Sequence, residues 1–307
     1  AQNLILINSQ TIGQLTTCLD SVMYTVEVEN PSPFYLDSVI VSVDLPEGVE
    51  YLSGSLTGGS EVDVSDLNAP QFALDDIETL TFSSFSFYIK SNCEAINTIY
   101  SGTPINNVVE LNFNSNGYGL TETHESDYYT ILAPNLSITN ITNQSYSGNV
   151  GDVFNRCITI VNGGDGALAE LTLEDNHGTG IVITSVDVGS LTNSGNSETI
   201  FISGQDFLTV GNGDSLLDPG EQIVICETVE VLSCSDVSSN FSYYWGCGGL
   251  DCQNLADAAN VIFPGEVPDL VFTPSTDYSN SATNGACYGN NTNGDFGAHL
   301  QIHNDGT

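Results

Sequence analysis

The sequence predicts an all-β protein made of tandem antiparallel β-sandwiches. Apolar and polar residues alternate over short segments, among them 24–29, 39–43, 85–89 and 241–245. Such alternation is typical of strands that bury one face. Clusters of Gly, Asn, Ser and Pro separate these segments, and no stretch combines a helical period with helix caps. Short strands between turn-rich clusters are the pattern of a sandwich.

Repetition along the chain predicts the domain organisation. Three repeat units open with similar segments, at 3–7, 134–139 and 268–273. In each unit a strand that ends on Asn follows, at 24–30, 157–162 and 299–304. We therefore expect domains at 1–133, 134–266 and 267–307, with a loop inserted in the second at about 191–214. The third is expected to be truncated, so that the chain is a piece of a longer polypeptide. The linkers are short and contain proline, which predicts an extended rod.

The charge balance excludes several classes of partner. The chain has 39 Asp and Glu residues but only two Lys and Arg residues, Lys90 and Arg156, for a formal net charge of −37. Two cations cannot form the basic patch that nucleic acid or an anionic lipid surface requires. No apolar run is long enough for a membrane helix, so no membrane insertion is expected in this segment. Divalent cations and high salt suit such a chain.

The eight cysteines indicate an oxidising, extracytoplasmic compartment. Cys18 and Cys93 are the two cysteines of the first unit, and a bond between them is the simple expectation. In the second unit we expect Cys157–Cys226 to join two strands and Cys247–Cys252 to close a short loop. Cys234 is then left over, although a Cys234–Cys252 bond is an alternative. Cys287 belongs to the truncated third unit.

One loop is the best candidate metal site. Segment 211–221 bends at glycines and a proline and brings together four oxygen-bearing side chains, Asn212, Asp214, Asp218 and Glu221. Ca²⁺ takes six to eight oxygen ligands, so the loop predicts a calcium site. The spacing is not that of an EF-hand, and the alternative is a solvated turn before a strand. Segment 290–295 is a weaker relative of this loop.

No grouping of residues indicates catalysis, so the chain is not expected to be an enzyme. The four histidines are spread over three units, and neither GxSxG nor HExxH occurs. Tyr243, Tyr244 and Trp245 suggest a platform on which sugar rings stack, but such a strand more often fills a sandwich core. The core interpretation is the one we favour.

Two motifs carry a resemblance to a known family. Val28-Glu29-Asn30 is followed by a strand and then by Asp44-Leu45-Pro46-Glu47-Gly48. This order resembles the conserved-repeat immunoglobulin-like β-sandwich domains of giant bacterial cell-surface adhesins and filaments, including the gliding-motility adhesins that Bacteroidetes export by type IX secretion. The second unit keeps its Asn162 but lacks the Leu-Pro pair, so it departs from the family pattern there.

The resemblance implies an extracellular protein of the bacterial cell surface. Its function would be mechanical, as a structural segment of a large adhesin or surface filament that attaches to surfaces or other cells. Expected partners are copies of itself, in a homo-oligomer or multi-chain filament, and a cell-surface or polysaccharide target. The alternative is a carbohydrate-binding or accessory module of a secreted multidomain enzyme, which predicts an exposed aromatic platform and one domain unlike the others.

Overall fold

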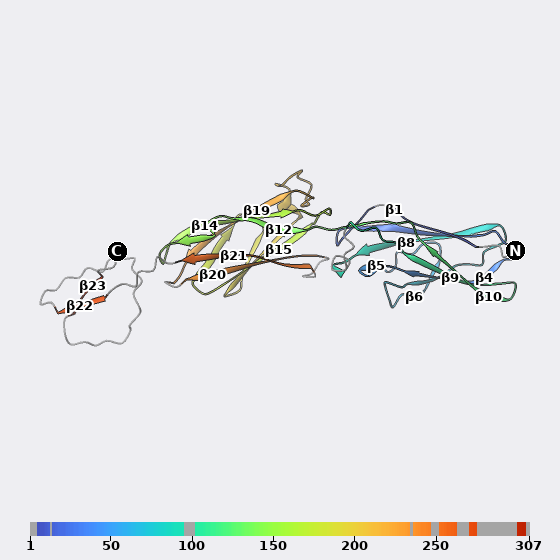
Figure 1. Cartoon of the computed structure of the whole chain (residues 1–307), viewed down its shortest axis with the longest axis horizontal. Helices are drawn as coiled ribbons and strands as arrows, with labels where there is room; N and C mark the ends of the chain where they lie inside the picture. The colour runs from blue at the N-terminus through green and yellow to red at the C-terminus, as the bar shows by residue number, and fades with distance from the viewer. Residues whose placement is uncertain are drawn as a thin grey trace.

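The structure, a computed structural model, describes residues 5–12, 14–94, 102–233, 236–246, 252–262, 270–274 and 300–304. Within these residues the chain is almost entirely β, which confirms the predicted fold class. Two β-sandwiches lie end to end along the long axis of the molecule, with the N-terminus at the far end of the first (Figure 1).

The first sandwich packs a four-stranded sheet on a five-stranded one. The four-stranded sheet has the order β1-β3-β8-β5, and the five-stranded sheet has the order β10-β9-β4-β7-β6. The strands are β1 (Leu6–Ile12), β3 (Ser21–Asn30), β4 (Leu36–Asp44), β5 (Val49–Tyr51), β6 (Ser60–Asp63), β7 (Gln71–Ala73), β8 (Thr81–Ser91), β9 (Val108–Ser115) and β10 (Tyr118–Glu125). All pairs within these two sheets are antiparallel.

The second sandwich repeats this plan with a four-stranded sheet and a six-stranded one. Its orders are β12-β14-β19-β16 and β13-β21-β20-β15-β18-β17. The elements are β12 (Leu136–Ile141), β13 (Ser145–Ser147), β14 (Val153–Asn162), β15 (Glu170–His177), β16 (Ile181–Val186), β17 (Ser190–Asn193), β18 (Ser197–Ser203), the short helix α2 (Gly204–Phe207), β19 (Gln222–Val231), β20 (Val237–Trp245) and β21 (Cys252–Ile262). Farther along, β22 (Leu270–Pro274) pairs with β23 (Leu300–Asn304).

The opening segment of each sandwich is divided into two strands that belong to different sheets, which in the first sandwich include the separate two-stranded sheet β11-β2. In the first sandwich, β1 pairs with β3, and β2 (Leu15–Thr16) then pairs in parallel with β11 (Ile131–Leu132). In the second, β12 pairs with β14 and β13 pairs in parallel with β21. The beginning of each unit is therefore joined to its end by backbone hydrogen bonds.

Only the second half of the predicted inserted loop at 191–214 is irregular chain. β17 and β18 occupy much of that range, and Ile200 and Ile202 of β18 are fully buried. The Gly, Asn and Ser residues that suggested a loop form the tight turn between these two strands. The irregular chain follows β18, as α2 and the segment up to Asp218, so it shares residues 204–214 with the predicted loop.

One buried asparagine ties together each sandwich at the end of its second long strand. The Asn30 side chain, fully buried, donates to the carbonyl oxygens of Phe34 at 2.9 Å and Ile77 at 3.1 Å. Asn162 is buried in the same way and donates to Gly166 at 2.8 Å and Leu217 at 2.9 Å. The amide thereby supplies donors to carbonyls that burial separates from water.

These contacts also define which residues of the two units correspond. Phe34 corresponds to Gly166 and Ile77 to Leu217, since the isolated bridges Leu36–Ile77 and Leu168–Leu217 occupy the same place. Leu80 and Gly220 correspond as well. The amide of Leu80 donates to the Asn30 carbonyl, and that of Gly220 donates to the Asn162 carbonyl.

Removing the Asn30 side chain is expected to destabilise the first sandwich. Asn30→Ala removes the hydrogen bonds from a fully buried amide to the Phe34 and Ile77 carbonyls and takes away the oxygen that accepts the Ser32 amide, so we expect a loss of about 3 kcal/mol in the free energy of unfolding. Urea denaturation followed by tyrosine fluorescence measures it. Asn112→Ala is the matched control, since that amide donates to an exposed carboxylate on the outer face. Equal midpoints for the two variants would contradict the role given to Asn30.

Candidate functional site: cross-links of the second sandwich

A disulfide joins the two central strands of the smaller sheet in the second sandwich. Cys157 on β14 and Cys226 on β19 are directly opposed, with their Cα atoms 4.0 Å apart. This confirms the predicted Cys157–Cys226 bond. The spacing suits a non-hydrogen-bonded pair in an antiparallel ladder, where side chains approach most closely. The bond closes a loop with a sequence separation of 69 residues.

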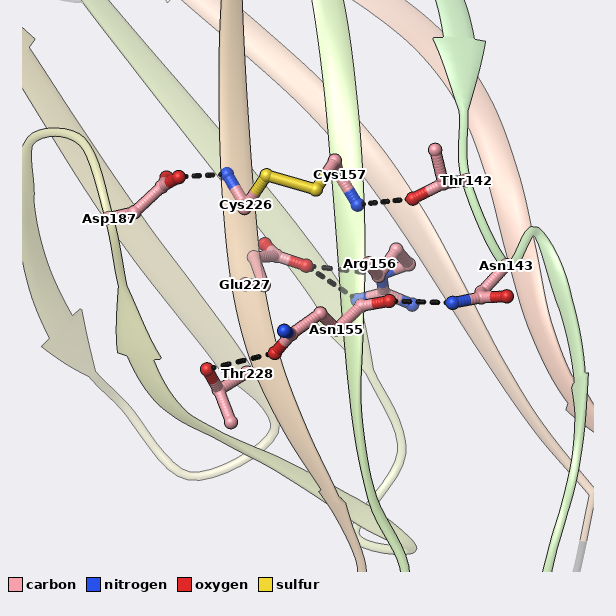
Figure 2. The surroundings of a disulfide bond; sticks show 9 residues. All are labelled: Thr142, Asn143, Asn155, Arg156, Cys157, Asp187, Cys226, Glu227 and Thr228. Atoms are coloured by element: carbon pink, nitrogen blue, oxygen red, sulfur yellow. Dashed lines mark hydrogen bonds and ion pairs between the residues drawn. A yellow bond between two sulfur atoms is a disulfide. The ribbon is translucent and has the colours of Figure 1, made fainter.

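Neighbouring side chains hold both half-cystines in place. The Cys157 amide donates to the Thr142 hydroxyl at 2.8 Å, and the Cys226 amide donates to the Asp187 carboxylate at 2.7 Å (Figure 2). The backbone N–H groups of such a pair point away from each other, so each needs a partner on its outer side. Thr142 and Asp187 supply these partners and tie the adjoining segments to the disulfide.

An ion pair occupies the adjacent rung on the opposite face of the same strands. Arg156 faces Glu227 across β14 and β19. Its Nε and Nη2 atoms donate to Glu227 Oε2 at 3.1 and 2.8 Å, as Figure 2 shows. Side chains of successive residues point to opposite faces of a sheet. The pair of strands is therefore linked covalently on its outer face and ionically on its core face.

Arg156 also connects the two sheets through the core. Its Nη2 contacts Asp175 on β15, and its Nη1 donates to the Ser239 hydroxyl on β20 at 3.1 Å. The guanidinium lies over the Phe241 ring, 4.9 Å from the ring centroid. Arg156, Asp175 and Glu227 are at most 1% exposed. Removing one member of such a buried set leaves another charge uncompensated.

A second buried pair lies nearby on the larger sheet. His177 of β15 contacts Glu198 of β18 through Nε2, and its Nδ1 is 2.7 Å from the Gly178 carbonyl oxygen. Together these five charged or titratable residues stand between two separate hydrophobic clusters of the second sandwich. The first sandwich has one continuous cluster instead. The second core is therefore divided by a polar layer.

Burial sets the protonation of this layer. Loss of solvation raises the pKa of Glu227 to about 7, against the opposing effect of the Arg156 charge. The pKa of Asp175 and that of Glu198 are also raised, with burial the largest cause for both. One guanidinium faces two carboxylates, and Asp175 Oδ1 and Glu227 Oε1 have no hydrogen-bond partner. A proton on Glu227 relieves the excess negative charge.

The first sandwich has uncharged residues at the same two rungs. Tyr24 and Phe87 stand opposite each other where Arg156 and Glu227 do, and their rings meet edge to face at 5.4 Å. At the next rung, where the second sandwich has its disulfide, the hydroxyls of Thr25 and Ser86 are 2.9 Å apart. One fold thus carries two different sets of cross-links, and the chain contains its own natural control.

The four residues of the candidate calcium loop do come together. The Asn212 amide nitrogen donates to Asp214 Oδ2 at 3.0 Å and to Asp218 Oδ2 at 2.7 Å. The two Glu221 oxygens instead accept the backbone amides of Asn212 at 2.8 Å and Asp218 at 3.1 Å. Glu221 therefore shapes the loop, whereas two carboxylates face a single donor. Among the described residues, no group of three or more His, Cys, Asp and Glu side chains is arranged around a common point.

The other predicted disulfides fare differently. The Sγ atoms of Cys18 and Cys93 lie 3.9 Å apart, although each residue is disulfide-bonded. A disulfide S–S bond is about 2.05 Å long, so the predicted Cys18–Cys93 pairing is wrong. The two cysteines lie close together, but each forms its disulfide with a different cysteine. Cys234 and Cys247 lie outside the described residues, as does the Cys252 side chain, so the Cys247–Cys252 prediction is untested.

The aromatic strand belongs to the core. Tyr243 and Trp245 are each 4% exposed, and both pack in the main hydrophobic cluster of the second sandwich. This confirms the core interpretation and leaves no stacking platform at these positions. In the part of the chain that the structure describes, no helix is long and apolar enough to cross a membrane.

The buried ion network is the feature that the sequence interpretation missed. A signal was present, because Arg156 stands between Phe154 and Ile158 at an inward-facing position of an alternating strand. Asp175 and Glu227 likewise occupy positions where the alternation calls for apolar residues. One positive and two negative side chains at core positions of different strands predict a buried ion network.

Comparison with known proteins adds likenesses of fold. No family model matches the chain, and no curated protein matches it. Solved structures that resemble it include the C-terminal domain of the Streptococcus agalactiae AgI/II polypeptide BspA, with a TM-score of 0.41 and 9% identity over 84% of this chain and 100% of that one. The C-terminal domain of the Streptococcus pyogenes antigen I/II-family protein AspA has a TM-score of 0.39 and 8% identity, over 85% and 100%.

A pilin is also similar. The full-length major pilin SpaD from Corynebacterium diphtheriae has a TM-score of 0.34 and 13% identity, over 78% of this chain and 56% of that chain. Since none of these likenesses reaches a TM-score of 0.5, none of them bears on the function of this chain.

The ion network predicts that acid stabilises the second sandwich. Because folding raises the pKa of Glu227 from 4.5 to about 7, its contribution is complete below pH 4.5 and is lost as the pH rises through 7. We expect the free energy of unfolding of the second sandwich to be about 2 kcal/mol larger at pH 5.5 than at pH 8, and its melting temperature to be correspondingly higher. Calorimetry at constant ionic strength measures the difference.

Glu227→Gln separates this effect from the general repulsion of an acidic chain. The amide imitates the protonated carboxyl, so the variant is expected to keep its stability at pH 8 and to lose most of the pH dependence. A variant that retains the full dependence of the parent would show that other carboxylates cause it.

Proposed function

We propose that this chain is a mechanical segment of a secreted bacterial cell-surface adhesin or filament. The observation that carries the proposal is the paired cross-link on β14 and β19, where a disulfide and a buried ion pair occupy successive rungs. Two cross-links on neighbouring rungs hold the central strands of the sheet together, which suits a domain that is pulled at both ends.

Tension acts on the second sandwich through its first and last strands. These are β12 with β13 and β21, which lie at the two ends of the unit in the sequence. If the fold opens, the 69-residue loop closed by Cys157–Cys226 stays shut. At about 3.4 Å for each extended residue, the disulfide withholds roughly 230 Å of extension. A stalk whose domains contain disulfide-closed loops therefore lengthens less when tension unfolds a domain.

Attachment under flow tests the function. We expect cells that display the parent polypeptide with Cys157→Thr and Cys226→Ser to attach as usual in still medium but to detach at lower shear. These substitutions reproduce the Thr25–Ser86 rung of the first sandwich, so the fold has a native precedent for them. The measurement is the shear stress that removes half of the cells in a flow chamber.

Three other outcomes count against the mechanical role. Equal detachment of parent and variant would show that the disulfide carries no load. Loss of attachment in still medium would make the segment part of the binding surface. Tight binding of purified glycans by the isolated chain would favour the alternative, a carbohydrate-binding module, although Tyr243 and Trp245 are buried.

We also propose that the acidic loop binds Ca²⁺ through Asp214, Asp218 and the Asn212 side chain. Burial raises the pKa of Asp218, and the nearby negative charges of Asp214 and Glu221 raise it further. The carboxylates of this loop therefore repel one another. A divalent cation relieves that repulsion and supplies positive charge to a chain that is formally at −37.

Calorimetric titration with CaCl₂ is the test of this site. We expect binding heat and a higher melting temperature, both abolished by EDTA and by Asp218→Asn. Asp66→Asn is a matched control, because Asp66 is also an exposed loop carboxylate that accepts a backbone amide. No heat with the parent chain, or equal heat with Asp218→Asn, would rule out calcium at this loop.

Association with copies of itself is the remaining part of the proposal. Ca²⁺ can bridge acidic surfaces of neighbouring chains, and salt weakens their repulsion. Light scattering of the parent polypeptide with and without Ca²⁺ distinguishes a filament from a monomeric stalk, and a monomer under both conditions excludes assembly.

A further inference from the structure

The linker between the sandwiches is hydrogen-bonded on both sides. Thr17 of the first sandwich donates its amide and hydroxyl to the Leu132 carbonyl, at 2.9 and 3.2 Å. On the other side, the Ala133 amide donates to Asp165 Oδ1 at 3.0 Å, and the Ala133 carbonyl accepts the Gly166 amide at 3.0 Å. The two sandwiches therefore meet at a docked junction.

Cysteines lie at this junction on the side of the first sandwich. Cys93 belongs to the main hydrophobic cluster of the second sandwich, and Cys18 packs against that cluster. A cleft of about 200 Å³ runs between the sandwiches, with Cys18 on one wall and Trp245 and Gly246 on the other. Cys18 thus faces the end of β20 across the junction.

The bonding of these cysteines can be deduced by elimination. Each of Cys18 and Cys93 is disulfide-bonded, but 3.9 Å separates their sulfur atoms, so they are not bonded to each other. The chain has eight cysteines, and Cys157 and Cys226 are bonded together. The first sandwich contains no further cysteine. The four that are left, Cys234, Cys247, Cys252 and Cys287, all follow residue 233.

We propose that Cys18 and Cys93 form two separate disulfides with cysteines that follow residue 233, and that these bonds cross-link the first sandwich to the part of the chain beyond the linker. The junction then has three covalent connections: the linker itself and two disulfides. Bending or twisting between the sandwiches is restricted, because three connections at separate points leave no free hinge. This holds whatever surface or cell the chain attaches to.

Each bond forms by thiol–disulfide exchange with a disulfide oxidant, such as an extracytoplasmic thiol oxidoreductase. One cysteine thiolate attacks the oxidant's disulfide and expels one thiolate of the oxidant. The second cysteine thiolate then attacks the mixed disulfide and expels the other. The cysteine pair loses two electrons and two protons, and the oxidant leaves as two thiols.

The scarcity of basic residues provides a direct test. Trypsin cleaves after Lys and Arg, and this chain has only Lys90 and Arg156. Complete digestion therefore gives three fragments, 1–90 with Cys18, 91–156 with Cys93, and 157–307 with the other six cysteines. The chain is alkylated without reduction, unfolded in urea, digested, and weighed by mass spectrometry before and after reduction.

The proposal predicts one covalent species of all three fragments, which separates into three on reduction. A species of 1–90 with 91–156 alone would restore the Cys18–Cys93 bond and overturn the proposal. Release of either fragment by itself overturns it as well. The undigested material must have the mass of one chain, because a mass of two chains would place the bonds between molecules.

Two single variants show which fragment each cysteine holds. Cys18→Ser is expected to release 1–90 while 91–156 stays attached to 157–307, and Cys93→Ser is expected to release 91–156 only. Cys157→Ser is the matched control, because its bond lies within one fragment and its loss releases nothing. Failure of the attachment experiment would leave these fragment patterns unchanged.

Discussion

The structure depends first on satisfying backbone groups where the chain leaves one sheet for the other. At that corner the carbonyls of two segments are buried together, and only isolated backbone bridges, Leu36–Ile77 and Leu168–Leu217, pair there. Asn30 and Asn162 add one side-chain amide each, which holds the two segments against the end of the strand. The sandwich plan is thus preserved in both units, although the loops after the asparagine share little: Phe34 in the first unit stands where Gly166 does in the second.

Much of this plan was predictable from sequence, because alternation and repetition report directly on which residues face a core. Tyr24, Val26 and Val28 were recognised for that reason, as was the Cys157–Cys226 bond between two alternating strands. The pairing of Cys18 was not predictable, because it depends on how one sandwich docks on the next. The inward-facing positions of Arg156 and Glu227 indicated a buried ion network, but alternation alone does not show which residue on another strand each charge contacts.

The two sandwiches show how one fold carries different chemistry at matched rungs. Tyr24 and Phe87 contribute an aromatic contact whose strength does not depend on pH, and Thr25 with Ser86 contributes a hydrogen bond that is insensitive to redox conditions. In the second unit, the Arg156–Glu227 pair responds to pH and the Cys157–Cys226 disulfide responds to redox conditions. An acidic, oxidising medium therefore strengthens the second sandwich relative to the first, and a neutral, reducing one brings the two closer together.

The division of the first strand has a consequence for how the protein is made. Because β2 pairs with β11 and β13 pairs with β21, the opening residues of each unit find their partners only when its final strand has left the ribosome. Contacts so distant in sequence form slowly and late. Each unit can therefore complete its fold only after its own synthesis has ended.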